Sequence, residues 1–365
     1  MRKYLFAAVC VAVTGFLAAI PFISLDTHGV FSSALDSPGT LQLLALCLVF
    51  GGVALSYDLL FGFSGLLSFG HALYFATGAY MTAIATTKWD WDLWQALAFT
   101  AALGIVLPLV LGTVSLRVGG IAFAMVTLAF AQAGNILVNK NPHGWTGGEE
   151  GVPVNYLKEP ASLVGVFNTK HLYWLALGYL VVVFLIVNWL IDSSPGRVFQ
   201  AVRENEQRVE VLGLQPFRYK LLAFVIGSFI ATAGGAVYAL LIGGATPDIS
   251  TASFTLTLLL MVVIGGTGTR WGAIAGGIVY TFLAQRLPDW SASKTISTLP
   301  GVLKTPLSQP LFVLGVLFIL LVLFLPGGIA GLASLAPRRR GLAVLERAVR
   351  TEPAPAEAEE EPEVI

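Results

Sequence analysis

The run TLQLLALCLVFGGVALSYDLLF, residues 40–61, carries a single charged side chain, Asp58. An apolar helix of about 20 residues is long enough to span the ~30 Å hydrocarbon core of a bilayer. We therefore interpret residues 40–61 as a transmembrane helix. Runs of similar length and polarity recur along the 365-residue chain, which predicts an all-α polytopic membrane protein.

The overall composition supports the same class. Hydrophobic residues make up 56% of the chain and charged residues only 12%, whereas soluble domains carry about a quarter charged residues. Cys10 and Cys47 lie in apolar runs, and the four histidines are scattered, so no metal or redox site is expected. The lipid bilayer is the expected environment, and no nucleic-acid partner is expected.

About ten apolar runs are candidate transmembrane helices. Arg2 and Lys3 precede the first of them like the start of a signal peptide, but no clear cleavage site follows, so we expect a retained helix. The candidate spans lie near residues 4–25, 40–61, 66–87, 92–114, 118–138, 171–191, 219–243, 253–269, 271–287 and 310–330.

Lysine and arginine predict the orientation of these spans. With a cytoplasmic N-terminus, 14 of the 21 basic residues fall on the cytoplasmic side and 7 on the other, as the positive-inside rule requires. Both termini are therefore predicted to be cytoplasmic. Residues 1–335 form the predicted transmembrane domain, and the Pro-, Ala- and Glu-rich residues 336–365 a disordered acidic tail.

A charged segment, SSPGRVFQAVRENEQRVEVLGLQPFRYK (residues 193–220), interrupts the apolar pattern on the predicted cytoplasmic side. Ser194 and Pro195 are typical of a helix start, and Gly213 followed by Pro216 is typical of a helix end. The pattern therefore predicts one amphipathic helix in a cytoplasmic loop of about residues 192–218.

The apolar stripe of this predicted helix consists of Val198, Val202, Val209 and Leu212. Lipid could cover the stripe, but a polar face that mixes acids with bases is not typical of a helix on an anionic membrane. Packing on the protein's own loops and docking into a groove of a partner protein both remain open.

Polar residues inside the spans are candidates for a translocation path. Gly62, Gly65, Gly70 and Gly78 surround Ser64, Ser68 and His71, and such interruptions can leave backbone groups free to line a cavity. Close helix packing and helix-to-helix hydrogen bonds are the alternative reading. The candidate path residues are Gly65, Ser68, His71, Gln132 and Asn135.

On the predicted outer side, TGGEEG (residues 146–151) lies in a long loop that is rich in turn residues. Gly147, Gly148 and Glu149 are candidate contact residues of this loop, because exposed acids can pair with basic residues of a partner. A plain surface turn is the alternative.

Four stretches carry a family resemblance in the family's own order. They are GFSGLLSFGHALYFATGAYMTA (62–83), SPGRVFQAVRENEQRVEVLGLQPFRYKLLAFVIGSFIATAGGAVYA (194–239), GGTGTRWGAIAGG (265–277) and LPGGIAGL (325–332). Together they resemble the permease subunits of branched-chain amino acid ABC importers, and in particular the longer, M-type permease. The likeness extends to about residue 335.

This resemblance implies a membrane subunit that pairs with a second, related permease, two cytoplasmic ATPase subunits and an extracytoplasmic binding protein, in the bacterial cytoplasmic membrane. The chain would bind no cofactor, and ATP would bind the partner subunits. Glu206 and Gly213 match the glutamate and glycine of the family's coupling loop, although the alanine pair of other importer classes is absent. The residues implied in ATPase coupling are Arg197, Arg203, Glu206, Val209, Leu212, Gly213 and Pro216.

The function expected from this resemblance is import of branched-chain amino acids, with urea, short amides or other amino acids as alternative cargo. No Gly-Lys dipeptide occurs, so the chain has no phosphate loop of its own. A stand-alone secondary transporter is a weaker alternative, because no series of acids crosses the spans. An enzyme is not expected, since the sequence shows no nucleophile–base or carboxylate pair.

Overall fold

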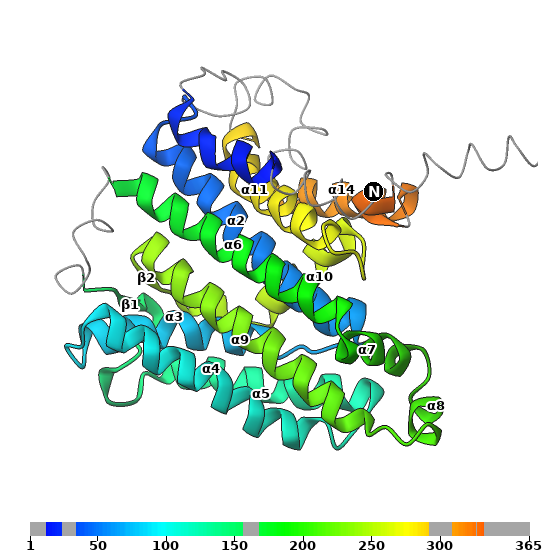
Figure 1. Ribbon diagram of the computed structural model, residues 1–365. Coiled ribbons are helices and arrows are strands. Elements are labelled where there is room, and N and C mark those ends of the chain that lie inside the picture. Colours follow the sequence, from blue (N-terminus) through cyan, green and yellow to red (C-terminus); the bar gives the residue numbers. More distant parts are fainter. Residues whose placement is uncertain (1–11, 24–33, 156–167, 292–308, 326, 332–365) are drawn as a thin grey trace, which may run out of the picture.

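The computed structural model of the chain describes residues 12–23, 34–155, 168–291, 309–325 and 327–331, and these are mostly helical (Figure 1). A first helix, Ala12–Phe22, ends in the 3-10 turn η1 (Ile20–Phe22). The longer helices that follow are α2 (Pro38–Asp58), which continues as the π-helix η2 (Leu59–Phe63), α3 (His71–Thr87), α4 (Leu93–Ser115), α5 (Gly120–Lys140), α6 (Thr169–Asp192), α9 (Pro216–Ile242), α10 (Ala252–Gly265), α11 (Gly272–Ser291) and α14 (Pro310–Phe324).

Six of the described helices are long and apolar enough to cross a membrane. They are Pro38–Phe63, Leu93–Ser115, Gly120–Lys140, Thr169–Asp192, Pro216–Ile242 and Pro310–Gly331. Of the remaining candidate spans, 4–25 is described only from residue 12 to residue 23, α3 has 17 residues, α10 has 14, and the 20-residue α11 is not among the six. An all-α polytopic architecture is therefore confirmed, while the count of ten spans stays a prediction.

Helix α2 occupies the centre of the bundle and is buried along most of its length. It packs against α6, α9, α10 and α11, while α14 covers α10 and α11 from outside (Figure 1). Cys47 lies buried on α2, in line with a structural role.

Helices α3 and α9 pack so closely that glycine is needed where they touch. A Cβ atom on Gly78 would lie 1.9 Å from the carbonyl oxygen of Thr232, and one on Gly235 would lie 1.9 Å from that of Phe75. Each helix therefore presents a glycine to the backbone of the other. For Gly78, this is the close-packing alternative stated above.

The loops gather at two opposite ends of the bundle. One end holds the short helices α7 (Ser194–Glu204) and α8 (Glu206–Val211), and the other holds the antiparallel pair β1 (Val152–Pro153) and β2 (Gly244–Ala245) (Figure 1). The 3-10 turns η3 (Pro142–Gly144), η4 (Gly148–Glu150) and η7 (Pro247–Ser250) lie in the loops that carry β1 and β2. We refer to these as the α7–α8 end and the β1–β2 end. The predicted acidic tail, residues 336–365, lies outside the described residues.

Candidate functional site

A break in the helical path separates η2 from α3. Residues 64–70 form no helix, although Ser64, Leu66 and Ser68 are all buried. Gly65 has a φ of +72°, a left-handed conformation that glycine adopts without steric cost. The predicted span at 66–87 is therefore wrong at its start, since α3 begins only at His71.

Two threonines from other helices satisfy the backbone of this break. Thr127 on α5 accepts a hydrogen bond from the Phe69 amide at 3.1 Å. Thr255 on α10 donates to the Phe69 carbonyl at 3.2 Å and accepts from the Ala72 amide at 3.1 Å. Unpaired backbone groups are costly inside a membrane, so these hydroxyls stabilise the break. The sequence reasoning did not single out either threonine.

Replacing Thr255 with valine is expected to destabilise the protein by about 1–3 kcal/mol, because it leaves the Phe69 carbonyl and the Ala72 amide without their shared partner. The measurement is the unfolding midpoint in an SDS titration of protein in mixed micelles. Thr255→Ser keeps the hydroxyl and should stay near wild type. Thr257, whose hydroxyl bonds its own helix at Ser253, supplies the matched Thr→Val control. An equal loss in both valine variants would contradict the role of Thr255.

His71, the first residue of α3, is fully buried beside the break. Its Nε2 lies 2.9 Å from the Ser56 hydroxyl, which already donates to the Val53 carbonyl at 2.7 Å. Ser56 must therefore accept a hydrogen from Nε2, which leaves Nδ1 as an acceptor. Among the described residues, Nδ1 has no hydrogen-bond partner. The ring meets Tyr57 edge to face, with centroids 5.2 Å apart.

The structure brings three of the five predicted path residues together. Gly65 and Ser68 lie in the break and His71 lies at its end. The other two lie on α5. Asn135 donates to the Ser250 hydroxyl at 2.8 Å, and Gln132 is exposed on the surface of the helix. Helix α5 reaches the break through Thr127 instead.

At the α7–α8 end, the predicted single amphipathic helix is two helices. Ser193, rather than the predicted Ser194, caps α7 by accepting from the Gly196 amide. Asn205 interrupts the path with extended backbone angles and caps α8 by accepting from the Arg208 amide at 3.0 Å. An asparagine side chain that satisfies a helix start competes with continuation of the preceding helix. Gly213 ends α8 with a φ of +81°, as predicted.

The predicted apolar stripe is split by this hairpin of α7 and α8. Val202 and Val209 are buried, together with Phe199, which the sequence reasoning missed. Leu212, predicted within the same stripe, is 77% exposed, and its neighbour Val211 is 88% exposed. Leu212 is the C-cap of α8, directly before the left-handed Gly213, so it lies where the helix ends and does not continue the buried face of Val209.

The remaining predicted coupling residues differ in their surroundings. Arg197 is exposed, and Pro216 is the buried first residue of α9. Glu206 pairs with Lys220 at 2.6 Å, although almost half of its side chain stays exposed. Arg203 turns toward the membrane domain and donates to the carbonyl of Gly62 in η2. The hairpin is therefore tied to the helix that leads into the break.

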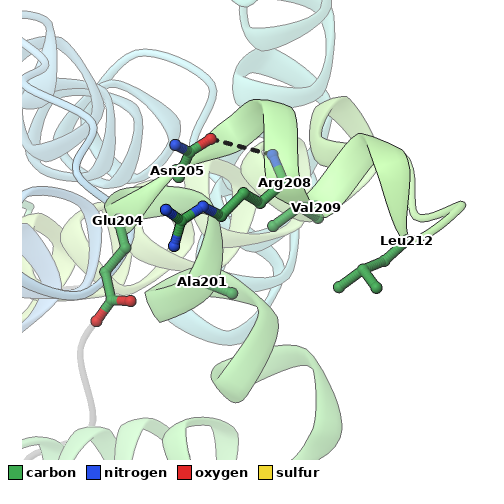
Figure 2. Close-up of a pocket in the computed structure, with 6 residues that line it drawn as sticks. All are labelled: Ala201, Glu204, Asn205, Arg208, Val209 and Leu212. Carbon is green, nitrogen blue, oxygen red and sulfur yellow. Dashed lines mark hydrogen bonds between the residues drawn. The ribbon is translucent and has the colours of Figure 1, made fainter.

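A hollow of about 320 Å³ lies inside the hairpin. In Figure 2 the side chains of Glu204, Asn205 and Arg208 lie on one side of this hollow, and Leu212, at the end of α8, lies on the other side. Ala201 and Val209 complete the lining. The site thus combines charged groups with the exposed apolar side chain of Leu212.

At the β1–β2 end, Asn141 organises the predicted outer loop. Its side-chain oxygen accepts hydrogen bonds from the amides of Thr146 and Gly147, each at 3.0 Å. Gly147 and Gly148 both adopt positive φ, and Gly148 is buried while Glu149 is exposed. The loop therefore presents its acids on an ordered turn.

Comparison with known proteins identifies relatives. The family model described as the permease component of branched-chain amino acid transport systems matches residues 39–325. The high-affinity branched-chain amino acid transport system permease protein LivM of Escherichia coli K12 is 28% identical over 280 residues, 70% of this chain and 65% of the relative. The LivM protein of Salmonella typhimurium LT2 is 27% identical over the same shares. The chain thus spans 65% of the length of these two relatives.

A relative named for another cargo also matches. The autoinducer 2 import system permease protein LsrC of Klebsiella pneumoniae is 32% identical over 193 residues, 48% of this chain and 52% of the relative. No solved structure matches the chain.

These findings agree with the six membrane-length helices and confirm both the predicted family resemblance and the predicted location as a multi-pass protein of the cytoplasmic membrane. The matched region includes the helix break, the hairpin and the ordered outer turn. The chain belongs to the family of branched-chain amino acid transport system permease components.

Proposed function

We propose that the chain is a membrane-spanning subunit of an ATP-driven importer for branched-chain amino acids. The observation that carries this proposal is the hairpin at the α7–α8 end. Its exposed apolar tip consists of Val211 and Leu212, and its Arg203 contacts Gly62 in the helix that leads into the break. Backbone groups at a break inside a membrane domain can contact a substrate. A partner that binds the hairpin could therefore move the break through the contact of Arg203 with Gly62.

The hairpin suits a cytoplasmic ATPase as its partner. Exposed apolar side chains follow the exposed charged residues Arg208 and Glu210 in the sequence. They are Val211, Leu212, Leu214 and Phe217. An apolar centre with a charged rim is typical of a protein interface. Because the sequence has no phosphate loop, ATP would bind two partner ATPase subunits, and this chain would hold no cofactor.

The remaining parts of the proposed assembly follow from the spans and the outer turn. Ten spans with both termini in the cytoplasm put the hairpin inside and the β1–β2 end outside. There, Gly147, Gly148 and Glu149 would contact a substrate-binding protein. A second, related permease would complete the membrane domain, as the chain is one permease component of a transport system.

Branched-chain amino acids are the proposed cargo because the LivM relatives are named for their transport. The break itself, residues 64–70, contains no charged side chain, which suits a net-neutral zwitterion. Urea or a short amide would be compatible with the same lining, and the autoinducer 2 relative illustrates cargo variation.

The test is affinity purification of the full chain from its native membranes, with identification of co-purifying proteins by mass spectrometry. Two ATPases and a second permease are expected. Uptake of radiolabelled leucine by proteoliposomes of that complex, with isoleucine, valine, urea and acetamide as competitors, then tests the cargo. Recovery of the chain alone, with ion-driven uptake that needs no nucleotide, would support a stand-alone transporter instead.

A further inference from the structure

Arg203 is a hairpin residue whose side chain contacts the membrane domain directly. Its Nη1 donates to the carbonyl of Gly62 in η2. Its aliphatic stem packs on the break itself, since a Cβ atom on Gly65 would lie 3.0 Å from Cγ and 3.3 Å from Cβ of Arg203. One side chain therefore contacts both the helix before the break and the first turn of the break.

A third element meets Arg203 at the same point. The Gly268 amide, in the turn between α10 and α11, donates to Asp58 Oδ1 at 2.9 Å. A Cβ atom on Gly268 would lie 3.2 Å from Arg203 Nη1 and 3.3 Å from the Gly62 oxygen. We call Asp58, Gly62, Arg203 and Gly268 the α7–η2 junction.

Charge makes this junction sensitive to the loss of Arg203. Asp58 is fully buried at the end of α2, and the positive charge of Arg203 acts on its carboxylate. Removal of Arg203 takes this nearby positive charge away and leaves the Gly62 carbonyl without its donor. The junction is therefore expected to be stable only while the hairpin sits where Arg203 can reach it.

The same turn is also tied to the helix that leads into the hairpin. Arg270 binds the Asp192 carboxylate and the Asn188 side chain, both near the end of α6. Helix α7 follows α6 directly. A movement of the hairpin is thus opposed by the contact of Arg203 with η2, and the α10–α11 turn that meets this contact is itself held to α6.

We propose that Arg203 is a positioning residue that transmits movement of the hairpin to the helix break, through the Gly62 carbonyl and the Asp58–Gly268 contact. The assignment rests on the proposed function, in which the hairpin docks on an ATPase. It separates two roles within the hairpin: the exposed tip binds the partner, and Arg203 carries the motion inward. Loss of Arg203 should uncouple the subunits without dissociating them.

The experiment compares Arg203→Ala and Arg203→Lys with the wild type, each purified with its co-purifying ATPases. The control is Arg117→Ala, because Arg117 is an exposed arginine after α4 for which the structure records no side-chain bond. Leucine uptake driven by ATP is expected to fall about tenfold or more in Arg203→Ala. ATPase recovery should be unchanged, and Arg203→Lys, which keeps a donor and a charge, should regain part of the uptake.

A second readout separates transmission from a purely structural role. Leu67, half-buried in the break, is replaced by cysteine in a chain whose own Cys10 and Cys47 are serine, and its labelling by a water-soluble maleimide is followed. ATP with vanadate should change the labelling rate when Arg203 is present and leave it unchanged in Arg203→Ala.

Each result has a distinct meaning. If Arg203→Ala keeps wild-type uptake and nucleotide-dependent labelling, Arg203 does not transmit and the inference is wrong, while the importer proposal stands. If the wild type itself recovers no ATPase and transports without nucleotide, the proposed function fails first. Loss of ATPase recovery in Arg203→Ala alone would assign Arg203 to docking and overturn its role in transmission.

Discussion

Gly78→Val is expected to prevent the chain from folding stably in the membrane. The first added carbon already lies 1.9 Å from the Thr232 carbonyl oxygen, and that oxygen belongs to the backbone of α9, so it cannot turn aside as a side chain could. Helices α3 and α9 must separate, which also disturbs the hydrogen bond from Thr232 Oγ1 to the Tyr74 carbonyl. The expected loss is about 3 kcal/mol or more. The measurement is the fraction of monodisperse protein in detergent and its midpoint in an SDS titration.

Gly178→Val is the matched control, since a Cβ atom at this glycine of α6 has no other atom within 4 Å. It makes the same change in side-chain volume in another membrane-length helix. Gly78→Ala should fall between wild type and Gly78→Val, because the Cβ alone already makes the contact. Equal yields and midpoints for Gly78→Val and Gly178→Val would show that α3 and α9 are not packed as described.

The spans on α2, α4, α5, α6 and α9 could be predicted because each depends on the local chain alone: about 20 apolar residues with turn residues at the ends. Gly213 could be predicted for the same reason, as a glycine after a helical pattern ends the helix within a few residues. These features require no knowledge of what packs against the segment.

The break before α3 depends on atoms far away in the sequence, and this is why the predicted start at residue 66 was wrong. Residues 66–70 are apolar enough to be helical, but their backbone groups bond to Thr127 and Thr255, 58 residues or more away along the chain. An isolated hydroxyl in an apolar helix was the available signal, yet most such hydroxyls bond their own helix, as that of Thr82 does at Gly78.

The hairpin was missed for a local reason. Asn205 lies in the charged run RENEQR, where the surrounding residues all favour helix, and its capping role shows only in the backbone. Within the resulting hairpin, the buried residues are Phe199, Val202 and Val209, whereas Val211 and Leu212, at the end of α8, form an exposed pair.

That exposed pair leads to the second large prediction: Val211→Asp combined with Leu212→Asp is expected to abolish co-purification of the ATPases. Central apolar residues of an interface commonly contribute 2 kcal/mol or more each, so losing two of them and burying two charges should weaken binding by at least about a hundredfold. The fold should survive, since neither side chain packs against the bundle. The measurement is the ratio of ATPase to permease in the purified complex.

Val118→Asp provides the control for this double variant. Val118 is an apolar residue, 40% exposed, in the turn between α4 and α5 and outside the hairpin. It adds one charge to an exposed apolar position, as each substitution in the hairpin does, and the ATPase ratio should stay at the wild-type value. An unchanged ratio in Val211→Asp with Leu212→Asp would mean that the ATPases dock elsewhere. The contact from Arg203 to Gly62 would then hold the hairpin in place without coupling it to ATP hydrolysis. A loss of uptake in Arg203→Ala would in that case reflect a structural role of Arg203 and not transmission from the ATPase.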